Sequence, residues 1–261
     1  MTAKRALLVV GHGSTRRPDA ARPTLELARV LGRRGGFDEA ATAFWKQPPY
    51  LDTVRFRAPV TCVVPNFAGE GLFTRHRIPE ALGLAGPETV LDDGRRVLYT
   101  RPPMAHPRLP VVLRERLDSV LAGPGIDPRE TAVLVVGHGS RRTESAGDTA
   151  HRLAGALAPG FGTAVAAFLE QPPWVHDWRS LVGDRPHVVV VPLLMGEGMH
   201  GRDDLPPLFN LDPDALASAD PVLGPVAAGG REVFYLRGPL PVETAADLAL
   251  DMIGDGPTGA G

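Results

Sequence analysis

The sequence contains one set of short motifs twice, in the same order along the chain. Three pairs of blocks carry the repeat: ALLVVGHGS at 6–14 and AVLVVGHGS at 132–140, AFWKQPP at 43–49 and AFLEQPP at 167–173, and VVPNFAGEG at 63–71 and VVPLLMGEG at 190–198. The spacing between the two members is nearly the same for all three pairs. Collinear repetition of this kind indicates a tandem duplication of one structural module.

The edges of the two modules follow from the blocks that end the repeat. Tyr99 begins a weaker fourth block, YTRPP, which returns as YLRGP from Tyr235 at a longer spacing, so the second copy carries an insertion. A stretch rich in Gly and Pro separates the copies, and a Gly-rich stretch follows the second. We therefore expect a first module at 1–122, a linker at 123–128, a second module at 129–253 and a flexible tail at 254–261.

Each copy alternates short apolar runs with segments of helical periodicity. The pattern predicts strands at 6–10, 41–44, 60–64, 96–99, 133–136, 164–168, 188–191 and 232–236, and helices at 23–31 and 78–84. This order predicts an α/β fold: two tandem three-layer domains, each with a mostly parallel sheet covered by helices on both faces. Ligands of such sheets bind beyond the carboxyl ends of the strands. The GHGS, QPP and GEG motifs each begin where a predicted strand ends, so they should line one crevice in each module.

Composition and missing motifs exclude several classes of function. The formal net charge of −2 gives no basic field of the kind that supports nucleic-acid binding. The glycine-rich fingerprints of nucleotide sites do not occur. Cys62 is the single cysteine, which excludes a disulfide or a cysteine-bound iron–sulfur cluster within the chain. No apolar run resembles a secretory signal or reaches the roughly twenty residues of a membrane span, so we expect a cytoplasmic protein without a membrane partner.

The histidines of the repeat predict a metal site in the second copy. His12 and His138 take equivalent positions between two glycines, directly after the first predicted strand of each copy. Gap-free alignment of the third block puts Phe73 opposite His200, so only the second copy keeps a histidine at both strand ends. Two neutral imidazoles on a rigid scaffold bind Co²⁺, Ni²⁺, Fe²⁺ or Zn²⁺ well. We therefore expect His138 and His200 to be metal ligands.

Charged residues near these histidines also differ between the copies. The unlike pairs are Arg77 opposite Asp204, and Lys46 opposite Glu170. Glu197, between the glycines of the third block, is predicted to complete the metal site or to take up protons, as is its counterpart Glu70. For both, a solvated surface carboxylate is the alternative. Glu170 is a similar candidate, and Lys46 in its place indicates that the two crevices no longer do the same work.

Other polar residues of the motifs carry weaker hypotheses. Ser14 and Ser140 lack the G-x-S-x-G elbow of a nucleophile, so we expect them to hydrogen-bond the following turn. His76 could replace the missing ligand of the first copy only if its segment were rearranged. His106, after the fourth strand, is a further candidate for the first crevice.

Together these motifs resemble the CbiX class of sirohydrochlorin chelatases. The matching features are GHGS after the first strand, a QPP-like block after the second, a G-x-H…D-[IL]-P block after the third, and PPMAHP at 102–107. The resemblance covers nearly the whole chain, taken as two modules. It implies a class II chelatase fold and insertion of Co²⁺ or Fe²⁺, with Ni²⁺ a further candidate, into sirohydrochlorin or a related tetrapyrrole of cobalamin or siroheme biosynthesis. The metal is then a substrate, no nucleotide is used, and His138 and His200 bind the metal and accept protons.

The carboxylate rim of such a substrate favours arginines near the crevice. The expected substrate-binding residues of the second copy are Ser140, Arg141, Arg142 and Arg202, and solvated loop charge is the alternative reading of the arginines. The resemblance thus assigns the chemistry to the second module and leaves His12 and Glu70 as the remnant of a first site.

A non-catalytic metal or tetrapyrrole carrier is the alternative function. Because the duplication supplies an internal partner, we expect a monomer with pseudo-two-fold symmetry.

Overall fold

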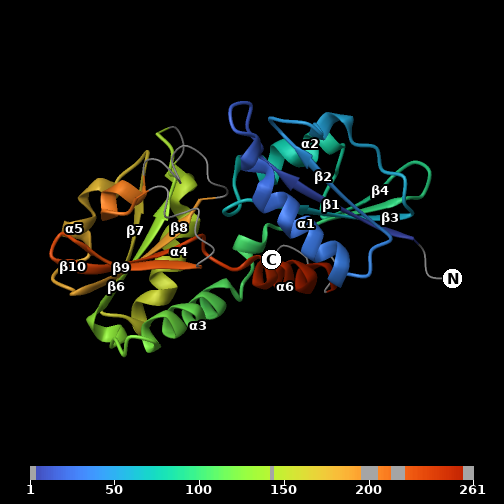
Figure 1. The fold of residues 1–261 in the computed structure, drawn as a ribbon. Helices are drawn as coiled ribbons and strands as arrows, with labels where there is room; N and C mark the ends of the chain where they lie inside the picture. The colour runs from blue at the N-terminus through green and yellow to red at the C-terminus, as the bar shows by residue number, and fades with distance from the viewer. Residues whose placement is uncertain (1–3, 142–143, 195–204, 213–220, 255–261) are drawn as a thin grey trace. The chain divides into compact units, whose positions relative to one another are not determined.

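A computed structural model describes residues 4–141, 144–194, 205–212 and 221–254. The chain forms two compact units, which are considered one at a time (Figure 1). The first unit comprises Met1–His106 together with Val242–Gly261, and the second comprises Pro107–Pro241. In the described ranges no helix is both long and apolar enough to cross a bilayer.

The first unit is built on a five-stranded sheet in the order β2-β1-β3-β5-β4. The strands are β1 (Arg5–Gly11), β2 (Glu39–Phe44), β3 (Val60–Pro65), β4 (Glu88–Val90) and β5 (Arg96–Tyr99). All neighbours are parallel except β4, which runs antiparallel to β5 at the edge. Leu7 and Val9 face one buried cluster while Leu8 and Val10 face another, which explains why β1 is apolar without interruption.

Helices cover both faces of this sheet. They are α1 (Arg22–Arg34), α2 (Ile78–Leu82) and α6 (Val242–Gly254). Leu27 and Leu31 of α1 join the cluster that contains Leu7, whereas Ile78 of α2 belongs to the cluster of Leu8 on the opposite face. A π-helical turn, Phe73–Arg77, leads directly into α2.

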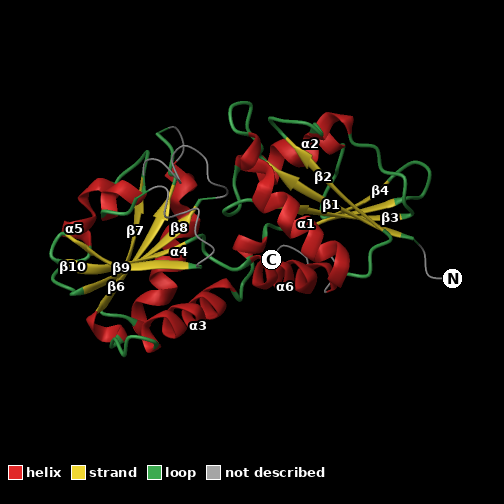
Figure 2. Cartoon of the chain, in the orientation of Figure 1, coloured by secondary structure: helices red, strands yellow, loops and turns green. Residues whose placement is uncertain are grey.

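The second unit repeats this architecture, with the strand order β7-β6-β8-β10-β9. Its elements are α3 (Leu109–Ala122), β6 (Thr131–Gly137), α4 (Asp148–Leu157), β7 (Thr163–Phe168), α5 (Trp178–Leu181), β8 (His187–Leu193), β9 (Val222–Ala228) and β10 (Arg231–Leu236). Among the described strands of this unit, β9 alone is antiparallel to its neighbour. Leu134 and Val136 pack with Trp178 and Phe209 in its largest described core cluster. Figure 2 shows the strands of each unit gathered in one sheet with helices around it.

The last helix of each repeat packs in the unit formed by the other repeat. Helix α6 lies beside α1, where Ala246, Ala249 and Ile253 join the buried cluster of the first sheet (Figure 1). Asp247 of α6 forms an ion pair with Arg34 of α1.

Helix α3 makes the reciprocal exchange and packs in the second unit, beside α4. The Arg114 guanidinium lies 4.7 Å from the ring centre of Phe161. Arg116 donates hydrogen bonds to the carbonyl oxygens of Gly238 at 2.9 Å and Pro221 at 3.1 Å.

The predicted α/β fold, with two tandem three-layer domains, is confirmed, and all eight predicted strands lie within observed strands. The antiparallel edge strands β4 and β9 were not predicted. Strand β4 has only three residues, and β9 contains Gly224 and Pro225, which disfavour a strand except at a sheet edge.

The compact units also differ from the modules expected at 1–122 and 129–253, because α3 and α6 are exchanged. The stretch at 123–128, expected as a linker, belongs to the second unit, and most of the expected tail lies outside the described residues.

Candidate functional site

The GHGS loop of the second unit is held against the QPP loop by backbone and side-chain hydrogen bonds. His138 directly follows β6, and its carbonyl oxygen accepts a hydrogen bond from the backbone N–H of Glu170 at 2.9 Å. The backbone N–H of Ser140 donates to Oε1 of Gln171 at 2.8 Å. Two motifs that lie far apart in the sequence therefore meet at the carboxyl ends of β6 and β7, as the repeat predicts.

The first unit builds the same loop pair. The backbone N–H of Lys46 donates to the carbonyl oxygen of His12 at 2.8 Å, and that of Ser14 donates to Oε1 of Gln47 at 2.7 Å. The Ser14 hydroxyl oxygen also accepts from two backbone N–H groups of the following turn, each at 3.2 Å, which confirms its expected role. The glutamines were not singled out in the sequence, although their place in both QPP blocks was the available signal.

Glycine is required between the histidine and the serine of this loop. Gly139 has φ +72°, and a Cβ atom there would lie 2.7 Å from Cγ of Gln171. Gly183, elsewhere in the same unit, has φ +62° with nothing within 4 Å of the same added atom. A left-handed conformation alone costs a non-glycine residue about 1–2 kcal/mol.

We expect Gly139→Ala to lower the free energy of unfolding by about 1–3 kcal/mol and the rate of a reaction at His138 by about tenfold or more, since it also displaces Gln171 and shifts His138. Gly183→Ala is the matched control and should cost stability alone. Urea unfolding and initial rates measure the two effects. Equal rates for the two variants would show that the Gln171 clamp does not position the loop.

The predicted site residues of the second unit are only partly described. His138 is exposed at the carboxyl end of β6, with Nδ1 3.1 Å from the carbonyl oxygen of Gly139. Ser140 is half-buried, Arg141 is exposed and Glu170 is half-buried. The remaining predicted residues, Arg142, Glu197, His200 and Arg202, lie outside the described residues.

The corresponding position of the first unit is packed with aromatic rings. The His12 ring centre lies 5.0 Å from that of Phe73 and 6.5 Å from that of Phe67. Nδ1 of His12 is buried and has no hydrogen-bond partner within the described part of the chain. Burial, and secondarily the charge of Lys46, lowers the pKa of His12 below its ordinary value. The imidazole is therefore neutral at neutral pH.

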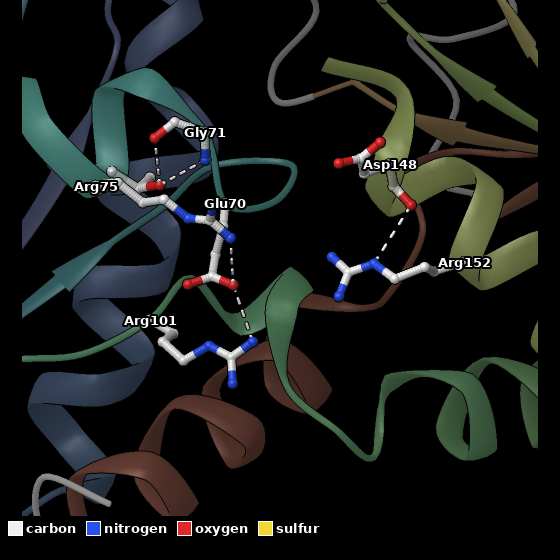
Figure 3. A network of polar contacts seen from close by, with 7 residues as sticks. Glu70, Gly71, Arg75, Arg101, Asp148 and Arg152 are labelled. Carbon is white, nitrogen blue, oxygen red and sulfur yellow. Dashed lines mark hydrogen bonds and ion pairs between the residues drawn. The ribbon is translucent and has the colours of Figure 1, made fainter. Parts of the chain in front are cut away.

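Glu70 is engaged by arginines rather than free to bind a cation. Its carboxylate lies 2.9 Å from Arg101 and 3.5 Å from Arg75 (Figure 3). Thr74 ties the π-helical turn to the loop that precedes it, because its hydroxyl oxygen accepts from the N–H of Gly71 at 2.9 Å. The sequence comparison placed Glu70 in a remnant metal site, and the structure shows that two guanidiniums bind this carboxylate.

Tyr99 of the fourth repeat block has a structural role that the sequence did not reveal. Its hydroxyl donates to the carbonyl oxygen of Thr74 at 2.7 Å, which links the end of β5 to the π-helical turn. Burial, with a smaller contribution from Glu70, raises the pKa of Tyr99. The phenol therefore stays protonated and serves as a donor.

Three further histidines lie on other elements. His76 is exposed on the π-helical turn and His106 is buried after β5. His187 lies at the amino end of β8, opposite the candidate site, with Nδ1 3.1 Å from the Glu232 carboxylate.

The paired loops, repeated at the carboxyl ends of two parallel sheets, agree with the comparison to known families. The CbiX family model matches residues 6–120 and again 132–228. The chain belongs to the CbiX family. Its two matched segments are the two repeats, so this is a CbiX protein with two modules in one chain.

The chain is similar to known proteins over nearly its whole length. A Halobacterium salinarum protein described as "Probable sirohydrochlorin cobaltochelatase" is 29% identical over 96% of this chain and 91% of its own length. Among solved structures, DR2241 from Deinococcus radiodurans, described as a multi-domain protein with structural similarity to chelatases, has a TM-score of 0.70 and 27% identity. The match covers 96% of this chain and 55% of the Deinococcus protein.

Two further structures show the same fold at lower identity. SirB from Bacillus subtilis, solved with Fe³⁺, has a TM-score of 0.69 and 19% identity, over 97% of this chain and 95% of its own. A structure described as CbiX, the terminal enzyme for biosynthesis of siroheme in denitrifying bacteria, has a TM-score of 0.66 and 23% identity, over 96% and 99% of the two chains.

Proposed function

We propose that this CbiX protein is a sirohydrochlorin chelatase that inserts Co²⁺ or Fe²⁺ into the macrocycle at its second module. The observation that carries the proposal is the exposed His138 imidazole at the carboxyl end of β6, on a loop clamped by Gln171. The Halobacterium relative, named for cobalt insertion into sirohydrochlorin, supports the same reaction.

The chemistry requires a loosely held metal ion and a base. Insertion of M²⁺ into the ring forms metal–nitrogen bonds and releases two pyrrole protons, which a neutral imidazole or a carboxylate can accept. Imidazole both binds such metals and exchanges protons near neutral pH. In the proposal His138 and His200 hold the ion, Glu197 assists proton uptake, and open coordination positions let the ion leave for the ring.

The first unit supplies a geometric argument for this pair. Two imidazoles that share one metal, with bonds of about 2.1 Å at a tetrahedral angle, have ring centres about 5 Å apart. Phe73, the sequence counterpart of His200, has its ring centre 5.0 Å from that of His12. The proposal requires the same spacing between His138 and His200.

Substrate recognition is proposed to use the charge that follows the GHGS motif. Arg141, Arg142 and Arg202 would bind the carboxylates of the macrocycle as charge-assisted pairs, with Ser140 in the same loop. We further propose a cytoplasmic monomer without nucleotide, nucleic-acid or membrane partners. Light scattering of the purified chain tests the monomer.

Anaerobic incubation with sirohydrochlorin and Co²⁺ or Fe²⁺, followed by visible absorption, tests the function. We expect insertion much faster than the uncatalysed reaction, and a parallel reaction with Ni²⁺ tests that ion. A folded protein that binds macrocycle or metal without accelerating insertion would instead be the carrier.

Glu170 provides a sharper test of the site, because the repeat places Lys46 at the equivalent position. We expect Glu170→Lys to weaken Co²⁺ binding and insertion by about tenfold or more, since an ammonium group beside His138 repels the cation. Glu170→Gln removes the charge without reversing it and should have a smaller effect. Equilibrium dialysis with Co²⁺ and initial rates measure both. Wild-type Co²⁺ binding and rates in Glu170→Lys would separate Glu170 from the metal site.

A further inference from the structure

A groove of about 720 Å³ lies on one face of the first sheet, toward the amino ends of its strands. Three segments line it: the stretch 52–57 that leads into β3, the end of α2 with Gly83, and the turn between β4 and β5. The GHGS loop follows the carboxyl end of β1, at the opposite edge of the sheet, so the groove is separate from the candidate site. Its volume is in the range of small-molecule sites.

The same region of the second unit is filled by an indole ring. The fifth residue after the QPP motif is Val54 in the first repeat and Trp178 in the second. Trp178 is fully buried, and its ring centre lies 5.2 Å from that of Phe209. Its Nε1 donates to the carbonyl oxygen of Leu208 at 3.1 Å. Val54 is only half-buried and lines the groove.

The neighbours of this ring are also smaller in the first repeat. The gap-free alignment of the third block continues with Ala81 opposite Leu208 and Leu82 opposite Phe209. The structure supports this alignment, because the next residue of each repeat has a left-handed backbone, with φ +65° and φ +55°. Ala81 and Leu82 both line the groove. An apolar hollow that lacks a large side chain can bind a small aromatic molecule in its place.

An arginine accompanies the ring position in both repeats. Arg179 directly follows Trp178, and its guanidinium carbon lies 4.8 Å from the centre of the Trp178 ring. Arg55 is the counterpart and directly follows Val54. Its guanidinium donates to the carbonyl oxygens of Asp52 at 3.0 Å and of Val54 at 2.7 Å. These bonds hold a cation at the wall of the groove, and guanidinium groups favour the face of an aromatic ring.

Charged groups of both signs line the groove. Among the residues that the structure describes, the side chains of Asp52, Arg57 and Glu80 form no ion pair or hydrogen bond, and all three residues are exposed. Arg95 differs, because it forms an ion pair with Asp93. A ligand with one carboxylate and one ammonium group therefore finds a partner of opposite charge for each.

We propose that this groove binds a small molecule with one aromatic ring system, a carboxylate and an ammonium group, as in an aromatic amino acid. The ring takes the place that Trp178 fills in the second unit, between Val54 and Leu82. The Arg55 guanidinium lies over its face, and the charged groups of the ligand pair with Arg57 and with the acidic side chains of the wall. The site does not depend on the proposed function, because it lies at the other edge of the sheet.

Saturation-transfer NMR of the full chain with L-tryptophan as the probe tests the proposal. We expect binding with a Kd of about 1 mM or tighter, which is the affinity typical of a ligand of this size. Indolepropionate lacks the ammonium group and tryptamine lacks the carboxylate. Each should bind about threefold more weakly or worse, because one exposed ion pair is lost.

Val54→Trp fills the groove as the second repeat does. We expect it to weaken binding by more than about tenfold and to leave the melting temperature unchanged or raised. Val90→Trp is the matched control, because it adds the same ring at a position 64% exposed on β4, outside the groove, and should bind like the wild type. Ala81→Leu restores the side chain of the second repeat at an exposed position and should also weaken binding, so it serves as a second variant if Val54→Trp does not fold.

Circular dichroism verifies that each variant is folded. No saturation transfer to L-tryptophan at about 10 mM would overturn the proposal, as would wild-type binding in folded Val54→Trp or Ala81→Leu. Indolepropionate or tryptamine bound as tightly as L-tryptophan would overturn the assignment of a ligand with both charges. None of these measurements uses metal insertion, so a failure of the chelatase proposal leaves them unchanged.

Discussion

Replacement of His138 by alanine is expected to lower the rate of metal insertion by at least about 100-fold, because the change removes both a metal ligand and a proton acceptor. His12→Ala is the equivalent change in the first module and should lower the rate by less than about tenfold. In the first unit of the wild-type chain the His12 ring packs against Phe73, which takes the position of a second imidazole. Both loops are held by the same backbone bond and the same glutamine bond, so the contrast reports on chemistry rather than on this clamp.

Initial rates of anaerobic insertion, with Co²⁺ and with Fe²⁺, measure this difference. His176→Ala, at an exposed histidine stacked on Trp174, serves as the control for loss of a surface imidazole and should match the wild type. Because His138 is exposed, its replacement should leave the melting temperature nearly unchanged. A larger loss in His12→Ala than in His138→Ala would move the active site to the first module.

Truncation after Pro241 is expected to unfold the first unit, although the deleted residues belong to the second repeat. Helix α6 buries Ala246, Leu248, Ala249 and Ile253. Burial of a large apolar side chain contributes about 1.5–3 kcal/mol, and the whole stability of a domain is about 5–15 kcal/mol. Loss of α6 also exposes Leu7 and its neighbours on the first sheet to water.

Hydrogen–deuterium exchange with peptide resolution locates the effect. Peptides that cover β1 and β3 should lose protection in the truncated chain, while those that cover β6 and β7 keep it.

Leu117→Ala gives the reciprocal test, because this fully buried residue of α3 comes from the first repeat but packs in the second unit. We expect it to destabilise the second unit by about 2–5 kcal/mol. In the truncated chain, loss of protection in the second unit instead of the first would contradict the helix exchange. In Leu117→Ala, loss of protection in the first unit instead of the second would contradict it as well.

The pattern of the sequence was sufficient for the eight parallel strands and for the loops that follow them. A strand buried on both faces must be apolar along its whole length, and the run ALLVV shows this directly. The duplication then made each motif interpretable, because parallel strands bring their carboxyl ends to one edge of a sheet. The placement of His12 and His138 at that edge could therefore be predicted, while the pairing of His138 with His200 stays a prediction.

Only the tertiary structure decided what surrounds these residues. In the structure α3 and α6 each bury one apolar face, but an apolar face does not specify the sheet on which it packs, because hydrophobic packing is non-directional. The sequence likewise presented Glu70 as a remnant of a metal site, whereas its carboxylate is bound by the nearby Arg75 and by Arg101, which comes from another segment of the chain. The sequence alone determined the fold, the repeat and the histidine positions through local patterns. The exchange of helices and the environment of Glu70 depend on contacts between distant segments, which no local pattern encodes.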